Sequence, residues 1–176
     1  MHLSFSDSDA YELQMGRWSR HLAESFLDFA GVSDGEAVLD VGCGTGALTF
    51  AILKRGDIGS VKAVDLTRSF IEYASKKNTH ASVEFSVADA CDLPFESRSF
   101  DRVLSLLCLH FIPDTNHCYR AARASCSSRS NGGCSSLGRT RWVRRTTHLL
   151  RHRRDAGRKG SACSCAVFNA VARDID

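Results

Sequence analysis

The 176-residue sequence has no apolar run that approaches the ~18 to 20 residues needed to cross a bilayer, so we expect no transmembrane segment. Met1–Ala10 lacks the basic and apolar regions of a secretory signal, and we therefore expect a cytoplasmic protein. The eight cysteines form no paired C-x-x-C framework, and we expect no metal site. In a cytoplasmic protein, Cys43, Cys91 and Cys108 are expected to be reduced thiols.

Acidic residues are also missing, but only from one part of the chain. Residues 115–154 contain ten Arg and no Asp or Glu. Residues 1–114 carry 10 Lys and Arg against 17 Asp and Glu, a net charge of −7, whereas residues 115–176 carry 13 against 3, a net charge of +10. With 43% hydrophobic residues the chain can form a globular core, and its length suits one domain. We expect that domain in residues 1–117 and a tail of a different kind in residues 118–176.

The expected tail is rich in Arg, Ser and Cys, and three interpretations of it remain open. Clustered Arg in residues 120–159 could neutralise the phosphates of a nucleic acid, which would make the chain a basic nucleic-acid-binding protein. The tail could instead be natively disordered. It could also be polypeptide translated out of its original frame, because GC-rich coding DNA read in a wrong frame gives such a composition.

Helical and strand patterns alternate through residues 1–114. Apolar residues spaced by three or four predict an amphipathic helix of about 14 residues, with Trp18, Leu22, Phe26 and Phe29 on its buried face. Short apolar runs predict strands that are buried on both faces, as in a parallel sheet. The expected strands are residues 37–41, 61–65 and 83–87 and a fourth within residues 100–111, centred on 103–107; helices are expected over residues 47–55 and from Thr67 onward. The expected fold class is α/β: a Rossmann-like, doubly wound parallel sheet that is incomplete after its fourth strand.

A glycine-rich turn joins the first expected strand to the helix that follows it. Its sequence, Val38-Leu39-Asp40-Val41-Gly42-Cys43-Gly44-Thr45-Gly46-Ala47, has glycines at alternate positions. Glycine permits positive φ and lets a ligand approach the backbone, while the following helix directs its first N–H groups at that ligand. The same residues satisfy the G-x-G-x-x-A variant of the dinucleotide pattern, so an NAD-dependent oxidoreductase is an alternative.

Three aspartates end or follow the first three strands, so their carboxylates are expected along one edge of the sheet. Asp40 would repel a pyrophosphate but attract an ammonium or sulfonium group, by about 1 kcal/mol at roughly 4 Å in water. Asp65 has the position from which a carboxylate accepts both hydroxyls of a ribose, and Asp89 follows the third strand. Ligands of open α/β sheets bind at this edge, so the set predicts a site for a cationic adenosine compound.

These residues resemble the class I S-adenosylmethionine-dependent methyltransferases, and among them the small-molecule enzymes of quinone biosynthesis. The resemblance covers residues 11–117. It rests on the stretches Val38 to Gly46, Ala63-Val64-Asp65, Ala88-Asp89-Ala90 before Leu93-Pro94-Phe95, and Ser99 to Val103 leading into Leu109-His110-Phe111. The resemblance implies S-adenosyl-L-methionine as the cofactor and in-line methyl transfer to a small molecule as the reaction.

The resemblance also implies which part of the cofactor the residues at each strand end contact. The residues expected at its methionine part are those of the first strand and its turn, Asp40, Gly42, Gly44 and Gly46. The residues expected at the rest of the nucleoside are Asp65 at the ribose, Leu66 against the adenine, and Asp89 with the backbone of Ala90 at the adenine amino group. Leu107 and Cys108, after the fourth strand, are expected under the reacting methyl group.

Two further residues are candidates for individual roles. Arg17 lies in a segment that resembles the N-terminal cap of close relatives, where it could pair with the methionine carboxylate; the alternative is a surface Arg beside a core Trp. His110 could act as a general base, since its unperturbed pKa is near ~6.5, or it could be a structural residue at a strand end. The family's fifth strand is not evident after residue 117, so we expect an impaired copy of such an enzyme, with low stability and little turnover.

Overall fold

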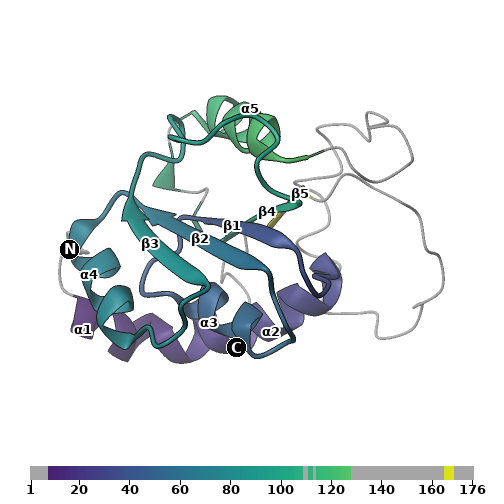
Figure 1. Ribbon diagram of the computed structural model, residues 1–176. Coiled ribbons are helices and arrows are strands. Elements are labelled where there is room, and N and C mark those ends of the chain that lie inside the picture. The colour runs from purple at the N-terminus through teal and green to yellow at the C-terminus, as the bar shows by residue number, and fades with distance from the viewer. Residues whose placement is uncertain (1–7, 109–110, 113, 128–164, 169–176) are drawn as a thin grey trace, which may run out of the picture.

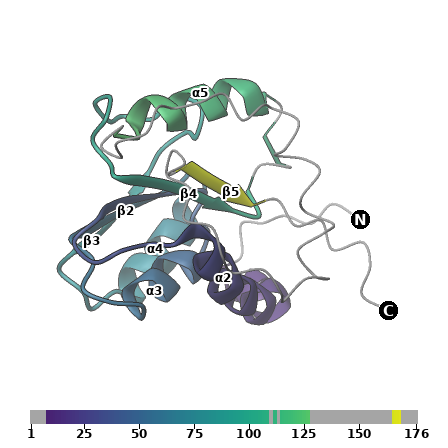
Figure 2. The same ribbon diagram turned by 90° about the vertical axis from the view of Figure 1, so that its right-hand side faces the viewer.

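The computed structural model describes residues 8–108, 111–112, 114–127 and 165–168. They include a parallel sheet, whose strands lie in the order β3 (Val83–Val87), β2 (Ser60–Asp65), β1 (Ala37–Val41), β4 (Arg102–Leu106) and β5 (Cys165–Phe168). Helices α2 (Arg17–Ala30), α3 (Ala47–Leu53) and α4 (Arg68–Lys77) lie on one face of the sheet. Helix α5 (Thr115–Ser125) lies on the other face, as Figures 1 and 2 both show. This architecture confirms the expected α/β class with a Rossmann-like parallel sheet.

The first four strands form where apolar runs predict them. They are β1 (Ala37–Val41), β2 (Ser60–Asp65), β3 (Val83–Val87) and β4 (Arg102–Leu106). β1 lies between β2 and β4, with Asp40 opposite Ala63 on one side and Leu104 on the other. The chain therefore changes direction across the sheet at β1, and the ends of β1 and β4 mark the point where open α/β sheets bind ligands.

A further strand, β5 (Cys165–Phe168), pairs in parallel with β4. The sequence pattern did not predict this strand, because no strand-like run follows β4 directly and the composition of residues 118–176 is atypical. The edge of β4 that faces away from β1 is therefore paired by a segment from far along the chain (Figure 2).

Three helices follow β1, β2 and β4 in the chain. They are α3 (Ala47–Leu53), α4 (Arg68–Lys77) and α5 (Thr115–Ser125). Asp114 caps α5 by accepting the His117 N–H at 3.0 Å. The helix crosses the boundary expected at residue 117, and Ala122 packs with Leu39 and Val103 of the sheet. Most of residues 118–176 lies outside the described residues, so the three interpretations of the tail stay predictions.

The N-terminal helical region consists of α1 (Ser8–Tyr11), a π-helical turn η1 (Glu12–Gly16) and α2 (Arg17–Ala30). The length of α2 confirms the expected 14-residue helix. Its buried face differs from the expected one, because Trp18 is 57% exposed and Phe29 is 52% exposed. The buried residues are Ser19, Ala23, Phe26 and Leu27. The small side chains of Ser19 and Ala23 face inward, which turns the two larger aromatic residues toward solvent.

A disulfide joins Cys91, in the loop after β3, to Cys118 in α5. This corrects the expectation that Cys91 is a reduced thiol. The two residues are 27 positions apart in the sequence, and only the packing of α5 over the loop brings their sulfur atoms together. Among the described residues, Cys43 and Cys108 are free thiols.

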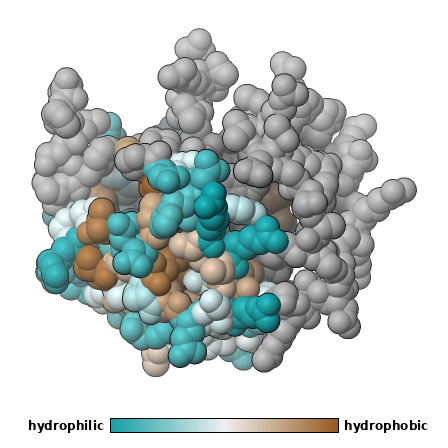
Figure 3. Space-filling model, turned by 90° about the horizontal axis from the view of Figure 1, so that it is seen from above, coloured by the Kyte–Doolittle hydropathy of each residue, from teal (hydrophilic) through white to brown (hydrophobic). Residues whose placement is uncertain are grey.

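The face that carries α5 is mixed in polarity. In Figure 3, brown apolar groups on the coloured surface alternate with teal hydrophilic ones. Arg120 and Arg123 of α5 are exposed. The remainder of the basic segment 120–159, which is residues 128–159, lies outside the described part of the chain. Within that described part, no helix is both long and apolar enough to span a membrane.

Candidate functional site

The turn from β1 into α3 depends on glycine at two positions. Gly42 has a φ of +73° and Gly46 a φ of +90°, which L side chains rarely adopt. A Cβ on Gly42 would lie 2.2 Å from Cys108 Sγ, and a Cβ on Gly46 would lie 2.7 Å from a ring carbon of Phe50. The Gly42 N–H donates to the Val64 carbonyl at 2.8 Å and so ties the turn to β2. The glycines predicted from the sequence therefore shape the turn.

Asp40 is completely buried at the beginning of this turn. Its Oδ2 accepts a hydrogen bond from Thr49 Oγ1 at 2.7 Å, but no described residue donates to its Oδ1. Burial raises the pKa of Asp40 to about 7, the Thr49 hydroxyl opposes that rise, and the charge of Asp65 adds to it. Near neutral pH this carboxyl group is therefore divided between its neutral and charged forms.

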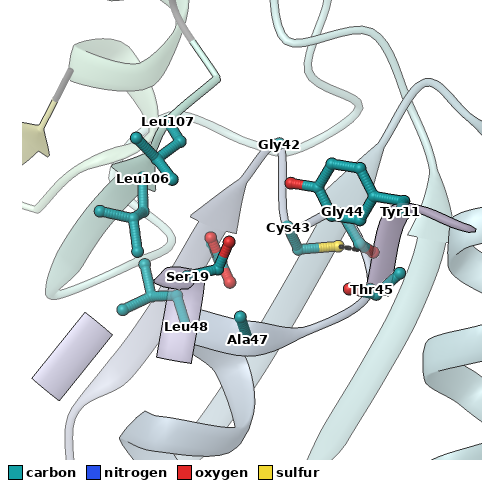
Figure 4. A pocket seen from close by; sticks show the side chains of 11 residues that line it. Tyr11, Ser19, Gly42, Cys43, Gly44, Thr45, Ala47, Leu48, Leu106 and Leu107 are labelled. Carbon is teal, nitrogen blue, oxygen red and sulfur yellow. Dashed lines mark hydrogen bonds between the residues drawn. The ribbon is translucent and has the colours of Figure 1, made fainter. Parts of the chain in front are cut away.

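A pocket opens beside Asp40 at the carboxyl end of β1. Gly42 and Gly44 of the turn line it, together with Leu107 from the end of β4. Tyr11 and Ser19, which come from the N-terminal helices, also line this pocket (Figure 4), and Tyr11 lies beside Gly44. The structure thus brings the N-terminal helices, the β1 turn and the end of β4 together around one buried carboxylate.

Asp65 ends β2 and holds the glycine turn from the other side. Its Oδ2 accepts the Gly44 N–H at 2.9 Å, and its Oδ1 accepts the Thr67 N–H at 2.8 Å. Each carboxylate oxygen has a second lone pair, so these bonds leave acceptor capacity for a ligand hydroxyl. Leu66, the next residue, is 69% exposed. The Asp65 carboxylate, which is expected to bind the ribose, is therefore half-buried and lies beside the exposed apolar side chain of Leu66.

The loop after β3 holds the other two residues expected at the adenine. Asp89 is exposed, and its Oδ1 accepts the Cys91 N–H at 2.8 Å within its own loop. Ala90 packs against the apolar cluster under α5. Neither residue lines the pocket beside Asp40. The assignment of Asp89 and Ala90 to the adenine therefore stays a prediction. It places the adenine at a part of the sheet edge that is more open than the pocket beside Asp40.

Leu107 and Cys108 follow β4 and meet the glycine turn. Leu107 lines the pocket and has a φ of +60°, a backbone conformation uncommon for leucine. Burial raises the pKa of Cys108 to about 12, and the charges of Asp65 and Asp40 add to that rise. The Cys108 thiol is therefore neutral at physiological pH and acts here as a small apolar group that fills the space left by the missing side chain of Gly42.

Sequence reasoning missed the contribution of Tyr11 and Ser19 to the pocket. Their only signal was the resemblance of their segment to a cap helix. Arg17, the candidate chosen from that segment, is exposed and does not line the pocket, so its proposed role has no support from the pocket geometry. His110, the candidate general base, lies outside the described residues.

A family model described as a methyltransferase domain matches residues 38–129, more than half of the chain. The chain belongs to this methyltransferase family. The matched region begins in β1 and contains the glycine turn, Asp65, the loop after β3 and α5. S-Adenosylmethionine is the cofactor of the family, as the sequence resemblance implied. The methyltransferase fold expected from the sequence is thus confirmed by the family match and by the sheet order.

Two curated relatives illustrate what this methyltransferase domain is similar to. Erythromycin 3''-O-methyltransferase from Saccharopolyspora erythraea is 39% identical over 103 residues, which are 56% of this chain and 34% of that protein. Demethylmenaquinone methyltransferase from Staphylococcus aureus is 38% identical over 86 residues, which are 48% of this chain and 36% of that protein. The chain therefore spans about a third of the length of these relatives.

Solved structures show the same similarity. The methyltransferase domain matches a structure of a methyltransferase complex with the Haloferax volcanii Trm112 activator, with a TM-score of 0.63 and 25% identity over 67% of this chain and 52% of that one. It also matches Haemonchus contortus phosphoethanolamine N-methyltransferase 2, solved with phosphomonomethylethanolamine and S-adenosylhomocysteine. That match has a TM-score of 0.61 and 28% identity, and it covers 70% of this chain and 31% of the other.

The residues of the pocket fit the family's cofactor. Asp40 Oδ1 is a buried acceptor without a donor among the described residues, and an ammonium group would supply one. The absence of a side chain on Gly44 leaves open space, since the atoms nearest to a Cβ there are 3.9 Å away, in Tyr11. The methyltransferase domain thus offers both the charge and the backbone access that the methionine part of the cofactor requires.

Proposed function

We propose that this chain binds S-adenosyl-L-methionine and is the cofactor-binding part of an enzyme that transfers its methyl group to a small molecule. The observation that carries the proposal is the fully buried carboxylate of Asp40, whose Oδ1 has no donor among the described residues. An unpaired buried carboxylate is costly, and a cationic group in the adjoining pocket relieves that cost. A pyrophosphate would increase the cost, so Asp40 favours the sulfonium cofactor over NAD.

The proposal assigns the cofactor's parts to successive strand ends. Asp40 pairs with the ammonium group, and the open backbone of the glycine turn admits the methionine part. The remaining assignments are Asp65 to the ribose, Leu66 to one face of the adenine, Asp89 and the Ala90 N–H to the adenine edge, and Leu107 to the floor below the methyl group. When bound, the cofactor supplies a methyl group on a sulfonium sulfur. The chain contributes by holding the two reactants within ~3 to 3.5 Å of each other.

The proposed acceptor is a small molecule. Its support is the names of relatives such as the erythromycin and demethylmenaquinone methyltransferases. Because the family's sequence pattern is lost after residue 117, we expect the chain to bind the cofactor and to turn over slowly or not at all. The roles of His110 as a general base and of Arg17 at the methionine carboxylate, and a cytoplasmic location, remain part of the proposal on sequence grounds alone.

Equilibrium binding tests the proposal directly. Isothermal titration of the full chain with S-adenosylmethionine, S-adenosylhomocysteine and NAD should give saturable binding of the first two and none of the third. NAD binding without binding of either methionine compound would overturn the proposal. A parallel titration with duplex and single-stranded nucleic acid should show no affinity that falls steeply with salt, which is the behaviour expected of a basic nucleic-acid-binding protein.

A further inference from the structure

Glu12 links the N-terminal helices to the glycine turn. Its Oε1 accepts a hydrogen bond from Thr45 Oγ1 at 2.5 Å, and its Oε2 accepts one from Arg20 Nη1 at 2.8 Å. The Glu12 side chain is only 14% exposed, and Thr45 is only 3% exposed. A charge-assisted hydrogen bond in such a shielded place is stronger than one between surface groups. The contact therefore joins two segments 33 residues apart through a buried hydroxyl.

The helix around Glu12 is shaped to accommodate this carboxylate. Glu12 begins the π-helical turn, a feature that occurs often at functional sites, and Gly16 ends it. Gly16 has ordinary helical dihedral angles, so it is not needed for its backbone freedom. A Cβ at Gly16 would lie 2.5 Å from Glu12 Oε2 and 2.8 Å from its Cδ. The missing side chain of Gly16 is thus the space in which the Glu12 carboxylate lies.

Two residues of the pocket wall lie on either side of Glu12 in the sequence. Tyr11 immediately precedes Glu12 and Ser19 follows the π-helical turn, and both line the pocket beside Asp40. In a regular α-helix, two residues eight positions apart point in directions that differ by about 80°. The wider π-helical turn between Tyr11 and Ser19 reduces this difference, so that both side chains can face the same pocket. Thr45 lines the same pocket, while Glu12 lies on its other side, in a second pocket with Arg20. Glu12 therefore supports the pocket wall from behind.

We propose that Glu12 is a positioning residue, which holds the wall formed by Tyr11 and Ser19 in register with the glycine turn around the methionine part of the cofactor. It acts through Thr45 and does not itself touch the ligand. This inference rests on the proposed function, because the ligand whose placement it serves is the sulfonium cofactor or its product. The contact with Arg20 is secondary, since the Arg20 side chain is 55% exposed and exposed ion pairs contribute little.

The test compares two ligands that differ only in the methionine part. S-Adenosylhomocysteine contains this part, whereas 5′-methylthioadenosine lacks its amino and carboxyl groups. Glu12→Ala should raise the Kd of S-adenosylhomocysteine about tenfold, the scale of one charge-assisted hydrogen bond, and that of methylthioadenosine less than about twofold. Glu12→Gln, which retains an acceptor for Thr45, should restore most of the affinity. The matched control is Glu24→Ala, which removes an ion pair between α2 and Arg55 and should change neither Kd.

A double-mutant cycle separates positioning from general loss of stability. Gly16→Ala should weaken S-adenosylhomocysteine binding in the wild-type chain, because the added methyl group displaces the Glu12 carboxylate. The same substitution in the Glu12→Ala chain should cause no further loss and should raise helix stability. Amide hydrogen exchange of the ligand-free chain should show faster exchange across residues 11–23 in Glu12→Ala than in Glu24→Ala.

The outcomes distinguish this inference from the proposed function. A wild-type chain that binds neither S-adenosylhomocysteine nor methylthioadenosine overturns the proposed function. A wild-type chain that binds both, with Glu12→Ala unchanged or weakened equally for the two ligands, overturns the positioning role of Glu12. Additive losses from Gly16→Ala and Glu12→Ala overturn it as well, because they would show that the glycine and the carboxylate act independently.

Discussion

The two ends of the candidate cofactor site differ in how the protein satisfies their carboxylates. At the methionine end, Asp40 is fully buried and one of its oxygens has no donor among the described residues. At the nucleoside end, Asp65 accepts two backbone N–H groups, and Asp89 is exposed and accepts one. In the proposed site, the methionine end therefore leaves one carboxylate oxygen for a ligand, whereas the carboxylates of the nucleoside end already bind the protein's own backbone.

This difference predicts opposite behaviour on mutation. A buried polar residue that only a ligand can satisfy lowers the stability of the free protein. Its replacement should therefore stabilise the fold and weaken ligand binding. A residue that organises the backbone should contribute to both stability and binding. The glycine turn lies between the two ends and belongs to the second kind, since its geometry is needed whether or not a ligand is present.

The largest effect is expected from Gly42→Ala. The substitution forces alanine into positive φ, and its Cβ would lie 2.2 Å from Cys108 Sγ. Strain and overpacking together should lower the free energy of unfolding by about 2 to 5 kcal/mol. Gly44→Ala is the matched control, because it also has positive φ but its nearest neighbour atoms are 3.9 Å away; it should cost only about 1 to 2 kcal/mol. Denaturant unfolding of both variants measures this, and equal losses would contradict the steric argument.

Asp40→Asn should have the next largest effect and should act in two directions. We expect S-adenosylmethionine affinity at pH 8 to fall by roughly 10- to 100-fold, with a smaller loss for methylthioadenosine. The folded pKa of Asp40 is about 7, raised from 3.8, so the stability that its neutral form contributes is present at low pH and is lost as pH rises through 7. The neutral Asn should therefore make the ligand-free variant more stable than wild type at pH 8. Calorimetric titration and thermal unfolding measure the two changes, and equal affinity losses for the two ligands would refute the placement of Asp40.

Asp65→Ala should weaken both ligands by about 1 to 3 kcal/mol, because both contain the ribose. It should also destabilise the free protein, since the N–H groups of Gly44 and Thr67 lose their acceptor. Binding and unfolding measurements on the same preparation would show these joint losses. An unchanged dissociation constant in a folded variant would mean that the ribose assignment is wrong.

The smallest expected effect is the pH dependence of wild-type binding. The ammonium group of the ligand prefers the charged form of Asp40, whose pKa in the free protein is about 7. Affinity for S-adenosylhomocysteine should therefore rise between pH 6 and pH 8, by at most about tenfold per unit below pH 7, and proton release should accompany binding. Titrations in buffers of different ionisation enthalpy report the released proton. Asp40→Asn should flatten this profile, and a slope that persists in the variant would assign the titration to another group.

Much of this molecule could be predicted from local patterns. Apolar runs located β1 to β4, and the alternating glycines with the aspartates at the strand ends predicted where a ligand would bind and which kind it would be. These signals are local because φ preferences, strand burial and the parallel-sheet edge constrain each short segment separately. The family resemblance then identified the cofactor, which the family match confirms.

Only the tertiary structure decided which distant segments meet. The sequence favoured Trp18 as a buried residue and Arg17 as a ligand contact, but Ser19 is buried and lines the pocket with Tyr11. A helical pattern fixes the angles between side chains, not the direction in which the helix faces its neighbours, and a π turn changes even the angles. The disulfide of Cys91 and the pairing of β5 with β4 are also contacts between distant segments. Such contacts depend on how whole elements pack, and no short window of sequence contains that information.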